Sequence, residues 1–92
     1  MEKIKFLFTI DAVFYIIGRG IVVTGEVNQG EINQGDDLEL IGNNTPIKTK
    51  CLHIEKRQIF VEKAKQGELI AIRLSNVSRQ DVAKGMKLVI KD

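Results

Sequence analysis

Hydrophobic and polar residues alternate along most of this chain, which is the pattern of strands that bury one face. In residues 6–10, two phenylalanines and Ile10 alternate with Leu7 and Thr9. The same period of two returns after Gly20, around residue 38, from residue 70 and near the C-terminus. We therefore expect one inward-facing set, which consists of Ile21, Val23, Val27, Leu38, Leu40, Ile70, Ile72, Leu74, Met86 and Leu88.

Glycine-rich and polar segments separate these alternating runs. Residues 28–30 and 33–36 have the composition of turns, and residues 42–46 that of a loop. Ser78 followed by Asp81 is typical of a helix start, and Gly85 would close a single helical turn. The pattern predicts an all-β domain, a barrel or sandwich of six to eight short strands with one short helical turn, spanning residues 1–92.

Residues 47–55 also predict a strand, but their alternation is irregular. Cys51 is at an odd position, whereas Leu52 and Ile54 are at even positions, so in a regular strand they would point to opposite faces. A bulge or burial of both faces is therefore expected. Cys51 and His53 are two apart and would share a strand face, as a Cys–His nucleophile pair would. A small buried thiol beside a partly exposed imidazole is the favoured interpretation.

Composition narrows the functional classes. The chain has 14 basic and 12 acidic side chains, a net charge of +2, which is too weak to indicate nucleic-acid binding by itself. It has no phosphate-binding loop, and it has neither the C-x-x-C nor the H-x-x-x-H spacing of zinc ligands. We therefore expect no cofactor, no metal and no catalytic activity. A single cysteine without a signal peptide or membrane span favours a cytoplasmic protein with no membrane association.

Residues 18–25 read GRGIVVTG, a tight glycine turn that leads into a β-branched strand. Gly25 within that strand predicts a bulge or a close backbone approach. This run, with residues 11–14 before it and SRQDVAKG at residues 78–85 after it, resembles the second domain of elongation factor Tu and related translational GTPases. The resemblance implies a small closed Greek-key β-barrel. It does not imply GTP binding, since those relatives hydrolyse GTP in a separate domain.

In those relatives, the glycine turn and a neighbouring strand line a groove for the aminoacyl end of tRNA. The resemblance implies that the matching positions here contact an RNA end. Two positions depart in character: Gln58 stands where an arginine is usual, and Arg73 where an apolar residue helps to form an adenine pocket. Asn76 also replaces a glycine. The candidate RNA-binding residues are Phe14, Gly18, Arg19, Gly20, Val22, Thr24, Glu55, Gln58 and Arg73.

Each of these residues also has a structural interpretation. Arg19 would be held by a nearby carboxylate to fix the turn, and Glu55 would be a solvated strand charge. The basic residues of the 48–65 region would guard a strand edge or face phosphates. The sequence favours a non-catalytic module that binds a tRNA 3′ end, another RNA or a translation-related protein. The alternatives are a structural protein-interaction module without RNA binding, and a domain of a larger GTPase.

Overall fold

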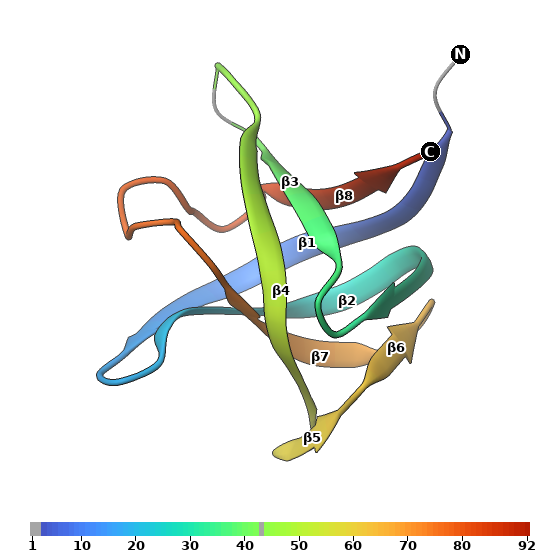
Figure 1. Ribbon diagram of the computed structural model, residues 1–92, viewed down its shortest axis with the longest axis horizontal. Coiled ribbons are helices and arrows are strands. Elements are labelled where there is room, and N and C mark those ends of the chain that lie inside the picture. Colours follow the sequence, from blue (N-terminus) through green and yellow to red (C-terminus); the bar gives the residue numbers. More distant parts are fainter. Residues whose placement is uncertain (1–2, 43) are drawn as a thin grey trace.

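The computed structural model describes residues 3–42 and 44–92 as a closed β-barrel (Figure 1). Six strands follow one another around it in the order β1, β8, β3, β4, β7, β2, and pairing of β1 with β2 closes it. Two short strands are added outside this ring, because β5 pairs with β4 and β6 pairs with β2. The strands are β1 (Ile4–Ile16), β2 (Gly20–Asn33), β3 (Asp37–Ile41), β4 (Ile47–Lys56), β5 (Ile59–Val61), β6 (Lys63–Lys65), β7 (Leu69–Leu74) and β8 (Lys87–Lys91).

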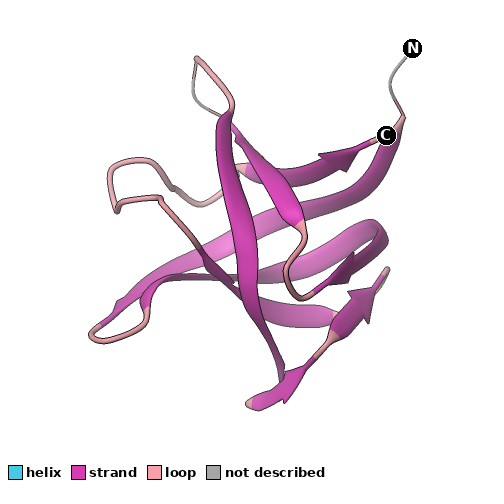
Figure 2. Ribbon diagram, viewed as in Figure 1, coloured by secondary structure: helices cyan, strands magenta, loops and turns pink. Residues whose placement is uncertain are grey.

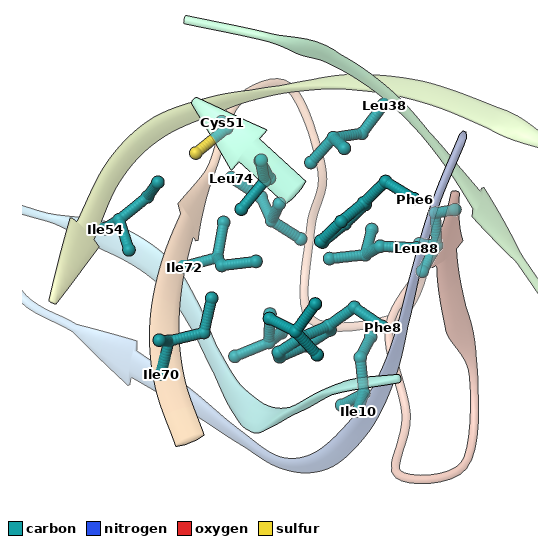
Figure 3. Packing of buried hydrophobic residues seen from close by; sticks show 14 of the residues in the cluster. Phe6, Phe8, Ile10, Leu38, Cys51, Ile54, Ile70, Ile72, Leu74 and Leu88 are labelled. Atoms are coloured by element: carbon teal, nitrogen blue, oxygen red, sulfur yellow. The ribbon is translucent and has the colours of Figure 1, made fainter. Parts of the chain in front are cut away.

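The inward faces of these strands fill the barrel with a single apolar core (Figure 3). Phe6 and Phe8 from β1 are fully buried, with ring centroids 6.4 Å apart in a stacked arrangement. Ile72 from β7 and Leu88 from β8 reach the same interior. The expected inward set is confirmed apart from Met86, which is half-buried, and the core also includes Val82 and Val89.

Bulges bend the two long strands around the barrel. The register of β1 against β2 shifts between Leu7 and Phe8 and again between Ile10 and Ala12. Gly25 pairs with Ile10 beside the second shift, and a Cβ atom there would overlap the carbonyl oxygen of Thr9. The close backbone approach predicted at Gly25 is therefore confirmed.

Two predictions about local structure are wrong. Residues 28–30 lie within β2 instead of forming a turn, because Gly30 continues the pairing opposite Phe6 with a φ of 75°. The described residues contain no helix, so the helical turn predicted at residues 78–85 is absent (Figure 2). This segment forms two tight turns. The Asp81 N–H donates a hydrogen bond to the Ser78 carbonyl in the first, and the Met86 N–H donates to the Ala83 carbonyl in the second. Helical bonding does not continue between them.

The bulge predicted in the strand of residues 47–55 is confirmed, and it separates Cys51 from His53. In the pairing of β4 with β7 the register shifts between these two residues, so Cys51 faces the core and His53 the outer surface. The expectation that they share one face is therefore wrong, because the extra residue reverses the parity. No helix in the described part of the chain is long and apolar enough to cross a membrane.

Candidate functional site

Cross-strand registers gather most of the candidate residues on the outer face of β1, β2, β7 and β4. Phe14 pairs with Val22, and Val22 pairs with Arg73 on its other side. Arg73 in turn pairs with His53, so these four residues form one row across four strands. Because side chains alternate along a strand, Thr24 and Glu55 belong to the next row on the same face, with Ala71 between them.

The β1–β2 turn places Arg19 above this face. Gly18 and Gly20 have φ values of 86° and 85°, which residues with a side chain rarely adopt. The Arg19 N–H donates to the Ile16 carbonyl at 2.8 Å and closes the turn. The guanidinium then reaches Glu55, with Nη1 3.0 Å from Oε1. The interpretation that a carboxylate holds Arg19 is therefore confirmed.

A small pocket opens where these side chains meet. Its cavity volume is ≈ 60 Å³, and Phe60 from β5 forms part of its wall. The Phe60 ring lies 5.6 Å from the Arg19 guanidinium carbon and 5.3 Å from the His53 ring centroid. The pocket thus combines aromatic faces, cations and one carboxylate. It is lined by Arg19, Val22, His53, Glu55, Phe60, Ala71 and Arg73.

Arg73 contributes a polar atom without a partner in this pocket. Its Nε is enclosed by surrounding atoms and has no hydrogen-bond partner within the described residues. An enclosed donor left unpaired costs free energy, on the order of 1–3 kcal/mol. If the surrounding side chains moved so that an acceptor oxygen or nitrogen reached the Arg73 Nε, the new hydrogen bond would recover part of this free energy.

A second, more open hollow adjoins the first and shares Glu55 and Ala71 with it. Its volume is ≈ 360 Å³ and it also contains Thr24 and Gln58. Gln58 lies in the two-residue turn between β4 and β5, where Arg57 and Gln58 have φ values of 54° and 67°. Two positive φ values are the geometry of the hairpin turns that match strand twist, although glycine or asparagine is usual there.

The candidate residues therefore form one continuous outer surface. Arg19, Val22, Glu55 and Arg73 line the pocket, while Thr24 and Gln58 line the hollow beside it. Phe14 flanks the pocket next to Val22, and the two glycines shape the turn above it. We call this surface, made by the two cavities with Phe14 and the turn, the outer groove.

Sequence reasoning missed the two ring-bearing side chains of the pocket, Phe60 and His53. Phe60 lies in a three-residue apolar run between polar neighbours, and its exposure of 58% has no signature in the sequence. In the sequence, His53 stands out only as a partner for Cys51, two residues away. The irregular alternation of residues 47–55 is the sequence signal for the β4 bulge, and this bulge places His53 on the outer face of the barrel.

The basic residues of the 48–65 region do not all face solvent freely. Lys50 pairs with Asp37 at 3.2 Å, and Lys56 contacts Glu68. The hydrogen bond from Lys56 lowers the pKa of Glu68, as does the backbone N–H of Lys65. The first contact joins β4 to β3, and the second joins the end of β4 to the β6–β7 turn, so both have a structural role.

Cys51 faces the interior. Burial raises the pKa of its thiol to about 12, and the charge of Asp36 acts in the same direction. A thiol held in the neutral form is a poor nucleophile. In the described residues, no group of three or more His, Cys, Asp or Glu side chains is arranged to hold a metal ion.

Comparison with protein families agrees with this architecture. Residues 20–89 match the family described as elongation factor Tu domain 2. The match begins at the second glycine of the β1–β2 turn and ends in β8. It includes the residues that line both cavities of the outer groove, apart from those in β1 and at the tip of the turn. Because it covers most of the chain and the structure is a small closed β-barrel, this protein belongs to the elongation factor Tu domain 2 family.

Proposed function

We propose that this barrel is a non-catalytic module that binds the 3′ end of an RNA, such as a tRNA, in the outer groove. The observation that carries the proposal is the convergence of the candidate residues on one hollowed face. Residues as distant in sequence as Arg19, Glu55 and Arg73 line a single pocket. GTP binding is not part of the proposal, because nothing in the chain resembles a phosphate-binding loop.

The chemistry of the groove suits the end of a single strand. Phe60 offers an exposed aromatic face, and a base stacked on such a ring contributes about 1–3 kcal/mol. Arg19 and Arg73 supply positive charge for phosphate oxygens, although Glu55 offsets part of it. With so few cations, binding by this barrel should be weak, with a Kd of about 10⁻⁴ M or higher.

The side chain at position 73 sets the character of the pocket. Arg73 occupies the wall with a charged guanidinium, where an apolar side chain would leave a surface suited to a base. We therefore expect the pocket to show little preference for adenine. Replacing Arg73 with leucine should create the apolar wall and strengthen contact with a terminal adenine.

The test is a titration of the ¹⁵N-labelled protein with an RNA minihelix that ends in CCA, followed by NMR. Binding in the groove should shift the amides of Gly18, Gly20, Thr24 and Glu55 together. Arg73→Leu should increase the shifts produced by the CCA end relative to a CCC end. Lys84→Leu is the matched control, since Lys84 is exposed outside the groove and its loss should not change that ratio.

Shifts confined to the lysines between residues 48 and 65, with the glycine turn unaffected, would contradict the proposal. They would show nonspecific charge attraction. An absence of shifts at high RNA concentration would leave protein interaction as the function to pursue. The exposed hairpin between β1 and β2 favours that second candidate, because Phe14, Tyr15 and Ile17 are large apolar side chains on the surface.

A further inference from the structure

The pocket of the outer groove holds more positive than negative charge. Among the described residues that line it, Arg19 and Arg73 are cations and Glu55 is the one acidic side chain. His53 is a third lining group that can carry a positive charge. Asp11 lines the neighbouring hollow and not the pocket. The pocket therefore lacks the negative charge that would balance its second guanidinium.

The two arginines of the pocket differ in how well they are paired. Glu55 Oε1 lies 3.0 Å from Nη1 of Arg19. Arg73 is half-buried, and across the residues that the structure describes it forms no ion pair and its Nε has no hydrogen-bond partner. Its cross-strand neighbours, Val22 and His53, supply no carboxylate. A guanidinium that is partly withdrawn from water gains much from an anion, so Arg73 is where an anionic ligand is missing.

The size of the pocket favours a small anion. Its volume of ≈ 60 Å³ has room for about four water molecules, given the space that one water requires. The oxygens of one phosphate group occupy a comparable space, whereas a purine base is too large to be enclosed. Arginine binds phosphate through paired N–H donors, and Arg19 uses only Nη1 toward Glu55. Donors of both arginines are therefore available to one phosphate.

We propose that the pocket binds a terminal phosphate monoester, and that its source is the 3′ phosphate of an RNA whose last base stacks on Phe60. This inference rests on the proposed function and names the chemical form of the RNA end. A monoester carries a charge of about −1.5 to −2 at pH 7, more than a phosphodiester within the strand. A terminal group also enters a small pocket without the chain continuing through it. Phe60 forms part of the wall with 58% of its area exposed, so a base outside the pocket can reach its ring.

Glu55 competes with the phosphate for Arg19. Its carboxylate would lie beside the phosphate oxygens, and like charges repel at this distance. Exposure of 48% and 28% for the Arg19 and Glu55 side chains makes their ion pair one that exchanges partners at small cost. Removing the charge of Glu55 should therefore strengthen phosphate binding. A weakening would be expected instead if Glu55 accepted a hydrogen bond from the RNA end.

Titration of the ¹⁵N-labelled protein with two CCA minihelices, one with a 3′ hydroxyl and one with a 3′ phosphate, tests the proposal. The readouts are the Kd from the groove amides and the Arg73 Nε–H resonance, whose enclosure slows its exchange with water. The 3′ phosphate should lower the Kd about tenfold and shift this resonance. Inorganic phosphate alone should shift it too, at higher concentration.

Three variants locate the phosphate. Arg73→Leu should remove the tenfold preference for the 3′ phosphate, and Glu55→Gln should increase it. Arg79→Leu is the matched control, because Arg79 contacts Tyr15 outside the pocket and its loss should leave the preference unchanged. Equal reductions by Arg73→Leu and Arg79→Leu would show general charge attraction and overturn the proposal. If the amide spectrum shows that Arg73→Leu does not fold, Glu55→Gln decides, and an unchanged or smaller preference overturns the proposal.

The same titrations separate this inference from the proposed function. Groove shifts with equal affinity for the two RNA ends would leave RNA binding standing and overturn the phosphate pocket. A shift of the Arg73 Nε–H by inorganic phosphate, with no groove shift by either RNA, would support the phosphate site and contradict RNA as its source. If neither RNA nor inorganic phosphate shifts any resonance of the groove, both proposals are wrong.

Discussion

The two halves of β1 are both rich in apolar residues but have opposite environments. In the first half, Phe6 and Phe8 are fully buried, whereas in the second half Phe14 exposes 50% of its area. The first half has β2 on one side and β8 on the other, and its inner face closes the core. The second half has β2 alone. Alternation identifies which residues share a face, but neighbouring strands decide whether that face is buried.

This difference separates stability from binding along one strand. The first half supplies large side chains to the core, while the second half supplies Phe14 to the outer groove. Substitutions in the two halves should therefore affect different measurements. The following predictions use that contrast, beginning with the largest effect.

Phe8→Ala should reduce the free energy of unfolding by about 3–5 kcal/mol, because it empties a fully buried site in the core. Phe14→Ala, the same change in the second half, should cost less than about 1 kcal/mol. Urea denaturation followed by circular dichroism measures both. Equal losses would show that the hairpin is as tightly packed as the barrel.

Gly25→Val should destabilise the barrel by about 1–3 kcal/mol or more, although valine is the better strand former. The new side chain would overlap the Thr9 carbonyl oxygen at the point where β1 bends. Thr24→Val is the control one residue away, on the half-exposed outer face, and should have little effect. A thermal midpoint for Gly25→Val equal to that of the wild type would exclude this steric role.

Alkaline pH should destabilise the folded protein through Cys51. Its folded pKa of about 12 lies above the value of 9.0 for an unperturbed thiol, so the unfolded chain loses its proton first. The contribution is fully present below pH 9 and should fall by about 1 kcal/mol by pH 10. Comparing the pH dependence of wild type with that of Cys51→Ala isolates it. Parallel pH profiles would contradict the assignment.

Arg19→Ala should change stability by no more than about 1 kcal/mol, since its ion pair with Glu55 is partly exposed to solvent. The RNA-induced shifts at the glycine turn should nevertheless decrease. Lys50→Ala breaks a comparable surface pair with Asp37 outside the groove and serves as the control. A loss of several kcal/mol would mean that Arg19 mainly holds the fold.

The sequence by itself determined the fold class, the inward faces and the backbone demand at Gly25. These follow from local rules: alternation assigns faces, and a glycine within a β-branched run indicates a close approach. The candidate residues around the GRGIVVTG turn were also identified, because the resemblance assigned them. Their convergence on one face required the registers of β1, β2, β7 and β4.

Only the tertiary structure decided the remaining features. It placed Phe60 and His53 in the pocket, since strand pairing and a bulge set their positions. It replaced the predicted helical turn near Ser78 with two tight turns, although the sequence carries a helix-start signal. It also left the second half of β1 without a neighbour on one side. Burial and pocket formation depend on contacts between residues far apart in the chain, and local patterns do not contain that information.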